Sequence, residues 1–174
     1  LVDYKGKFDL IKTGGENYSY IRKELDRLLG KGEKVDVISM MLSMTFFWKD
    51  EEMFNGLVET IKQCLKPDGV LIFLTMDGEL VSNFFNDRKR KTYEIVGGNK
   101  IELHSNGKEK EIGRRLDITL PGTIVAAEGE TQVEYLVFLD ELERAIGNWR
   151  LKKERVGNSL LKKRAQTFAS FYSY

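Results

Sequence analysis

The sequence lacks the residues that several classes of site require. Cys64 is the only cysteine among 174 residues, which excludes an internal disulfide and a cysteine-rich zinc site and fits a reducing compartment. His104 is the only histidine, and it stands without neighbours of metal-ligand type. No phosphate-binding loop, metal-ligand spacing or Ser/His/Asp arrangement is present. We therefore predict no metal site and interpret Cys64 and His104 as structural residues.

Excess charge and long apolar runs are also absent. The 28 basic and 27 acidic residues nearly cancel, so net charge gives no argument for binding to nucleic acid or membranes. No apolar run approaches the roughly 20 residues of a membrane span, and the first residues have no signal-peptide pattern. We expect no membrane partner and a cytoplasmic location.

Local basic runs remain as candidate contacts for phosphates. Arg88–Lys91 is the densest run, and Lys162–Arg164 is the next. Contacts of this kind would be sensitive to salt and blind to base sequence. The alternative interpretation of both runs is ordinary solvated surface.

With 41% apolar residues, the chain can bury one sizeable core, and we predict a single domain over 1–174. Because the chain begins at Leu1 instead of methionine, we interpret it as a piece of a longer protein.

Hydrophobic periodicity predicts an α/β fold. Strands with apolar runs alternate with helices whose apolar residues recur every three or four positions. The predicted strands of the first half cover 8–11, 34–39 and 70–75, and its helices cover 21–29 and 51–66. Three short strands separated by glycine turns indicate an antiparallel insertion over 92–126. Beyond it we expect a helix late in 134–146, a strand within 149–156 and a helical pattern over 160–172.

The segments after Ser39 and Thr75 are the first places to search for a site, because ligands of parallel sheets bind beyond the carboxyl ends of the strands. The first segment, 40–48, is rich in methionine and aromatic residues, and the second is Met76–Glu79. The alternative interpretation of the first segment is a buried aromatic cluster.

Four separated motifs resemble the mRNA cap guanine-N7 methyltransferases, in particular the capping enzymes of large DNA viruses. They are VDVIS followed by LSMTFFW at 35–48, LKPDGVLIFLTMDGEL at 65–80, the stretches 117–125 and 131–137, and the closing residues 169–174. The resemblance implies a partial Rossmann-like class I methyltransferase fold with a central, mainly parallel sheet. The donor-binding strand and glycine-rich loop of that family precede the matched residues, so we expect the domain to lack them.

The resemblance also implies roles for individual residues. It places Ser39, Met41 and Phe46 near the methyl donor, S-adenosylmethionine, and it places Thr45, Met76, Glu134 and Tyr172 around the cap guanine. Thr45 stands where many cellular members have histidine and Phe46 where they have tyrosine, which favours an apolar lining at these positions. The alternative interpretations are a surface or helix-start acid for Glu134 and packing residues for Met76 and Tyr172.

The expected chemistry needs few polar side chains. Guanine N7 carries a free lone pair and no proton, so no general base is required, and placement of the reactants supplies the catalysis, up to roughly 7–11 kcal/mol in model systems. We therefore predict no catalytic residue in the strict sense. A carboxylate at Glu134 would accept hydrogen bonds from guanine N1–H and its amine and would stabilise the charge that the ring gains.

We therefore expect an mRNA (guanine-N7) methyltransferase that acts on the capped 5′ end of RNA as part of a larger capping enzyme. Its partners would be other capping-enzyme domains or a stimulatory subunit, and its location a viral factory or virion if the protein is viral. Two alternatives stay open: a catalytically incomplete scaffold or stimulatory subunit, and a methyltransferase of the same fold with another substrate.

Overall fold

The computed structural model describes residues 9–87, 92–95, 99–104, 112–119, 131–147, 154–156 and 171–173. The first half of the chain contains α1 (Tyr18–Leu29), β1 (Val35–Met41), the 3-10 helix η1 (Met44–Trp48), α2 (Glu51–Cys64), β2 (Leu65–Met76) and α3 (Gly78–Asp87). The second half contains β3 (Thr92–Ile95), β4 (Asn99–Leu103), β5 (Arg115–Thr119), β6 (Thr131–Tyr135), α4 (Leu139–Ile146), β7 (Glu154–Val156) and β8 (Phe171–Ser173).

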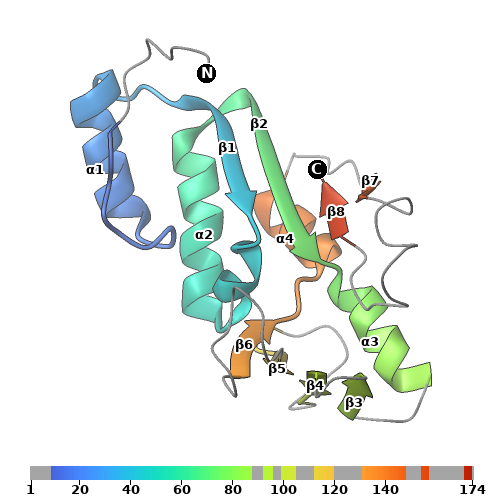
Figure 1. Ribbon diagram of the computed structural model, residues 1–174. Helices are drawn as coiled ribbons and strands as arrows, with labels where there is room; N and C mark the ends of the chain where they lie inside the picture. Colours follow the sequence, from blue (N-terminus) through green and yellow to red (C-terminus); the bar gives the residue numbers. More distant parts are fainter. Residues whose placement is uncertain are drawn as a thin grey trace, which may run out of the picture.

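Within the described residues, the strands form two four-stranded sheets. The first has the order β1-β2-β8-β7, in which β1 and β2 are parallel while β8 pairs antiparallel with β2 and with β7. The second has the order β3-β4-β5-β6 and is antiparallel throughout. Figure 1 shows β1 and β2 running in the same direction, with their carboxyl ends toward the second sheet. The predicted α/β class is confirmed.

Capping residues fix the ends of the first two long helices. The Asn17 side chain accepts a hydrogen bond from Tyr20 N at the start of α1, and Gly30, with φ of 112°, ends that helix. The Asp50 carboxylate accepts from Met53 N at 2.9 Å at the start of α2. Both helices begin near the residues that the sequence predicts, and α1 also ends where it is predicted to end.

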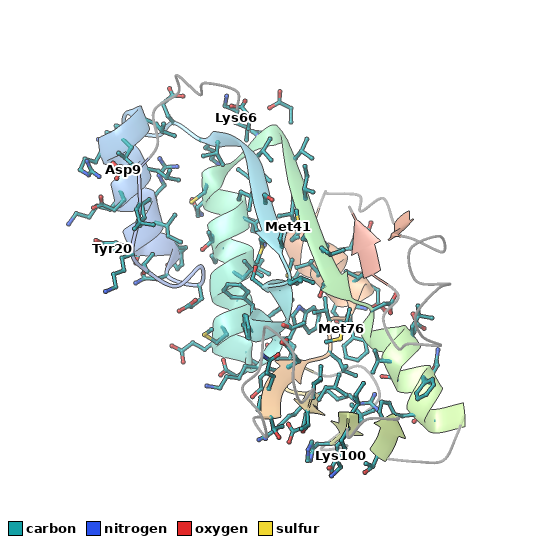
Figure 2. The ribbon with its side chains drawn as sticks, in the orientation of Figure 1. Asp9, Tyr20, Met41, Lys66, Met76 and Lys100 are labelled. Atoms are coloured by element: carbon teal, nitrogen blue, oxygen red, sulfur yellow. The ribbon has the colours of Figure 1, made fainter. Side chains whose placement is uncertain are left out.

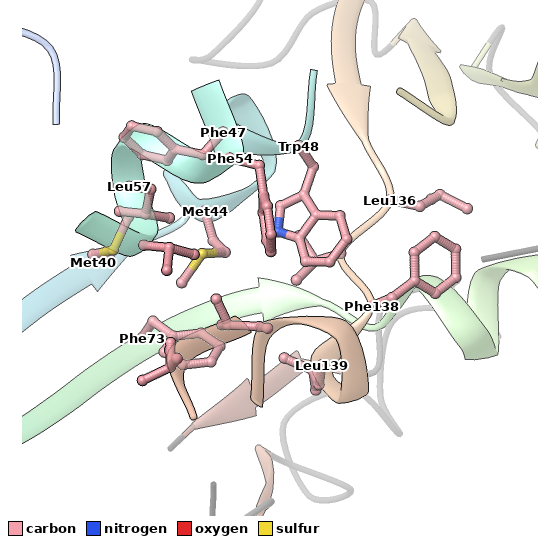
Figure 3. Close-up of a cluster of buried hydrophobic side chains, with 14 of the residues drawn as sticks. Met40, Met44, Phe47, Trp48, Phe54, Leu57, Phe73, Leu136, Phe138 and Leu139 are labelled. Carbon is pink, nitrogen blue, oxygen red and sulfur yellow. The ribbon is translucent and has the colours of Figure 1, made fainter. Parts of the chain in front are cut away.

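One face of the β1–β2 pair carries the core. Met40 of β1 and Phe73 of β2 are buried on this face, against side chains of α2 and α4. Aromatic rings extend the core toward the strand ends, since Trp48 lies 4.8 Å from Phe54 and 5.9 Å from Phe138 between ring centroids (Figure 3). The predicted aromatic cluster is therefore largely buried, and Cys64, at 2% exposure, belongs to the interior as predicted.

The other face of the same pair is exposed. Val37 and Met41 on β1 are 51% and 55% exposed, and Val70 and Ile72 on β2 are 50% and 36% exposed. Val37 is paired with Val70 and Ser39 with Ile72, so one serine interrupts the apolar side chains of this face.

Several predicted boundaries are wrong. The expected strand over 8–11 is absent at Asp9–Ile11, which follow an irregular path. The second helix ends at Cys64 instead of at residue 66, because β2 already begins at Leu65 and its register shifts before Val70. Close packing holds this shift, since a side chain on Gly69 would meet Asp36 O at 2.9 Å.

The elements after β2 differ from the prediction in three places. Helix α3 was not predicted, although Asp77 caps it through bonds from Glu79 N and Leu80 N. Strand β6 extends the antiparallel sheet to Tyr135, beyond the expected insertion, so Glu134 lies in a strand. Of the expected helical pattern over 160–172, the described residues 171 and 172 lie in strand β8.

Among the described residues, no helix has the length and apolar character needed to span a bilayer.

Candidate functional site

Three separate segments meet at the carboxyl end of β1 and β2. They are η1, which directly follows β1, the turn from β2 into α3, and the end of β6. Leu42 N donates to Leu74 O at 3.0 Å, which holds the turn after β1 against β2. Gly78 N donates to Val137 O at 2.8 Å, and Asp77 forms a parallel bridge with Val137, which joins β2 to the segment after β6.

The central contact of this region joins Thr45 and Glu134, which are 89 positions apart in the sequence. The hydroxyl Oγ1 of Thr45 donates a hydrogen bond to the carboxylate Oε2 of Glu134. Thr45 is 4% exposed, and its neighbours Met44 and Trp48 are fully buried, so η1 is anchored in the core. The family resemblance implies that Thr45 and Glu134 lie around the same guanine, and in the structure the two side chains are in direct contact.

Two residues, Gly113 and Arg114, form a connector that holds this contact from both sides. Gly113 N donates to Trp48 O at 2.8 Å, and Leu136 N donates to Arg114 O at 2.9 Å. The connector therefore bonds the chain three residues after Thr45 and two residues after Glu134. Gly113 has φ of 88°, and a side chain there would lie 3.3 Å from Lys49 O, so the position favours glycine.

Burial is the main influence on the Glu134 carboxyl group. It raises the pKa of Glu134 above the usual value for glutamate, and the hydrogen bond from Thr45 opposes this shift by stabilising the charged form. A partly desolvated carboxylate that keeps one polar partner is a suitable acceptor for N–H donors of a ligand.

The three residues expected near the methyl donor are exposed. Ser39 and Met41 alternate onto the open face of β1, and Met41 is 55% exposed. Phe46 is 50% exposed on η1, although its neighbours Thr45 and Phe47 are buried. The structure therefore places two apolar side chains and one hydroxyl at the surface on β1 and η1.

The remaining expected residues lie at the end of β2. Met76, half-buried and labelled in Figure 2, is the last residue of β2, and its backbone pairs with Phe171. The backbone of Tyr172 pairs with Thr75, one position before Met76, and the side chain of Tyr172 lies outside the described part. The basic runs Arg88–Lys91 and Lys162–Arg164 also lie outside the described residues.

Two residues of this region were missed by the sequence analysis. Leu42 has φ of 57°, the one non-glycine residue with positive φ in the described part, and it is 56% exposed. Such a conformation is uncommon for a bulky residue and tends to occur at functional sites. Asp77, at 9% exposure, lies within the predicted segment Met76–Glu79, and its Asp-Gly-Glu start is a recognisable helix signal.

A separate hollow of about 500 Å³ lies between the start of α1 and α2. It shares no residue with the Thr45–Glu134 region, and its lining is Glu16, Asn17, Tyr18, Glu52, Asn55, Gly56 and Glu59. In the described part of the chain, no group of three or more His, Cys, Asp or Glu residues has a metal-binding arrangement.

Comparison with known proteins finds one informative relative. The chain is 26% identical, over 136 residues, to a protein named as a probable mRNA-capping enzyme of Acanthamoeba polyphaga mimivirus. The match covers 75% of this chain and 11% of the relative, so the chain spans about one ninth of that protein. The predicted resemblance to a viral capping enzyme is confirmed by this similarity. No family model matches the chain.

Among solved structures, the chain is similar to an S-adenosylmethionine-dependent methyltransferase from Clostridium acetobutylicum. The TM-score is 0.48 and the sequence identity 15%, over 87% of this chain and 67% of the other.

Proposed function

We propose that this chain is part of an S-adenosylmethionine-dependent methyltransferase that transfers a methyl group to N7 of the guanine of an mRNA 5′ cap. The observation that carries the proposal is the contact between Thr45 and Glu134. It puts a partly desolvated carboxylate beside the exposed end of β1, where parallel sheets bind ligands. The similarity to the mimiviral protein supports the capping assignment.

In this proposal, Glu134 recognises the guanine. Its carboxylate accepts hydrogen bonds from N1–H and the exocyclic amine, which no other RNA base presents in that arrangement. The guanine ring becomes positively charged as the methyl group arrives, so the attraction to a carboxylate strengthens toward the transition state. Met76 and Tyr172 complete the proposed guanine site around Glu134 and its hydrogen-bond partner Thr45, and no residue acts as a general base.

Ser39, Met41 and Phe46 are the proposed contacts to the methyl donor. The exposed side chains of Met41 and Phe46 fit the apolar surface of the donor's adenine ring, and the Ser39 hydroxyl supplies one polar contact. S-adenosylmethionine, when bound, supplies an electrophilic methyl group on a sulfonium ion. The residues of this chain orient the two reactants and exclude water at Thr45 and Glu134.

The proposed substrate is the capped 5′ end of RNA, and the proposed partners are the other domains or subunits of a capping enzyme. Arg88–Lys91 and Lys162–Arg164 are the candidate contacts to the RNA phosphates.

Replacement of Glu134 tests the proposal most directly. In the full-length natural protein, Glu134→Gln and Glu134→Ala should lower methyl transfer to a guanosine-capped RNA by at least tenfold, because hydrogen bonds to a charged group are lost. Affinity for S-adenosylmethionine should stay nearly unchanged. Methylated nucleosides measured by mass spectrometry, together with calorimetric titration of the donor, give both quantities.

Glu141→Gln is the matched control, since Glu141 lies on α4 and pairs with Arg144 at the surface. It should leave both quantities unchanged. Full methylation by Glu134→Ala would overturn the cap assignment. An absence of both methyl transfer and donor binding in the full-length wild type would favour the alternative of a scaffold or stimulatory subunit.

A further inference from the structure

Thr45 has one hydroxyl proton, and its use decides what this residue can do. A threonine hydroxyl donates one hydrogen bond and can accept others. In the structure the proton is given to Glu134 Oε2, so it is not available to a ligand. At 4% exposure, Thr45 also offers almost no surface to solvent. Both observations point to a residue that acts through Glu134.

We propose that Thr45 is a positioning residue, which orients the Glu134 carboxylate and keeps it in the charged state that accepts N–H donors of a guanine. This inference rests on the proposed function and assigns Thr45 a role that direct contact with the nucleobase would not give it. With Oε2 fixed by Thr45, Oε1 and the remaining lone pair of Oε2 are left for the ligand.

The surroundings hold Thr45 rigidly enough for this role. Its neighbours Met44 and Trp48 are fully buried, and the backbone of Trp48 is bonded to Gly113 at 2.8 Å. The adjacent Arg114 bonds to Leu136, two residues after Glu134, at 2.9 Å. Donor and acceptor are therefore tied to the same connector, which limits the conformational entropy that the hydrogen bond must overcome.

The hydrogen bond from Thr45 is the polar contact of the Glu134 carboxylate that the structure shows, and several charged groups lie on the neighbouring elements. The helix η1 carries no titratable side chain, and the exposed Lys49 follows it. On β5, Arg115 and Asp117 flank the residue opposite Glu134 and are bonded to each other at 2.5 and 2.9 Å. Tyr135 on β6, Asp77 after β2 and the buried Arg114 are further charged or titratable side chains of this region. Burial first and Thr45 second account for the pKa shift of Glu134.

The test is the pH profile of kcat/KM for capped RNA in the full-length protein. In the wild type the acidic limb reports ionisation of Glu134. Thr45→Val keeps the size of the side chain and removes the proton, so the limb should move to higher pH. At neutral pH, kcat/KM should fall by about tenfold, because a hydrogen bond to a charged group is lost. Thr45→Ser keeps the hydroxyl, so the pH of its acidic limb and its kcat/KM at neutral pH should match those of the wild type.

The double variant Thr45→Val with Glu134→Gln separates positioning from packing. If Thr45 acts through Glu134, Thr45→Val should cost little once residue 134 no longer ionises. A uniform loss for Thr45→Val at every pH, or the same loss in the Glu134→Gln background, would overturn the positioning role. Full activity of Glu134→Gln itself would instead overturn the proposed function, so the two failures are distinguishable.

Discussion

Two regions of this molecule differ in what their side chains are used for. The core region, under α2, consists of apolar side chains such as Phe54, Ile61 and Phe73, at most 5% exposed. The strand-end region contains the Thr45–Glu134 pair, the left-handed Leu42 and the exposed side chains of Met41 and Phe46.

The difference separates the side chains that stabilise the fold from those of the candidate site. Apolar burial in the core region stabilises the fold, at about 25 cal/mol per Å² of surface removed from water. The strand-end region contains features that cost stability in the absence of a ligand: a carboxylate with its pKa raised by burial, a strained backbone and exposed apolar surface. Such costs are typical of sites that are preorganised for binding.

The largest expected effect is in the core region. Phe73→Ala should lower the free energy of unfolding by about 3–5 kcal/mol, because the ring is fully buried and its removal leaves a cavity. Ile72→Ala, one position along β2 on the open face, should cost about 1 kcal/mol or less. Chemical denaturation measures both free energies of unfolding. Equal losses in the two variants would show that the two faces of β2 contribute equally to stability.

The next effect concerns the helix that covers the core region. Asp50→Ala should lower stability by about 1 kcal/mol, because the Asp50 carboxylate accepts the bond from Met53 N at the start of α2. Asp50→Asn keeps an acceptor and should remain close to the wild type. If both substitutions had the same effect in thermal unfolding, the cap would not explain how α2 begins.

Glu134→Gln should act in the opposite direction and stabilise the protein at neutral pH. Because burial raises the folded-state pKa of Glu134, its contribution to stability is fully present below the unfolded-state pKa and is lost as pH rises through the folded value. Glutamine carries no charge, so the advantage of the variant should be absent in acid and grow as the pH rises. Urea unfolding across this pH range measures it, and a wild type as stable as the variant at neutral pH would contradict the prediction.

The smallest effect on stability is expected for Met41→Ala. Met41 is 55% exposed, so its truncation should change the free energy of unfolding by about 0.5 kcal/mol or less. In the full-length protein the same change should weaken S-adenosylmethionine binding severalfold. Val70→Ala, at 50% exposure on β2, is the matched control and should change neither quantity. If the wild type, Met41→Ala and Val70→Ala bound S-adenosylmethionine with equal affinity, Met41 would not belong to the donor site.

The sequence by itself determined the α/β class and the positions of most elements. Hydrophobic periodicity located α1, α2 and the strands β1, β3, β4 and β5, because amphipathic patterns and capping residues act over a few neighbouring positions. It failed where distant packing overrides local preference. The start of β2 at Leu65, in spite of Pro67 and Gly69, depends on pairing with Val35. The strand around Glu134 depends on pairing with β5.

For the candidate site, the sequence identified Thr45 and Glu134 separately, through motifs, and only the tertiary structure decided that one donates to the other. Periodicity carries no information about a contact between residues 89 positions apart, which forms when β5, β6 and η1 share the connector at Gly113 and Arg114. Leu42, with its left-handed backbone, is likewise tied to a distant residue, since its N–H donates to Leu74 on the neighbouring strand. Composition and local pattern thus determined which groups are present, and long-range packing decided which of them meet, because burial and hydrogen bonding depend on position in space.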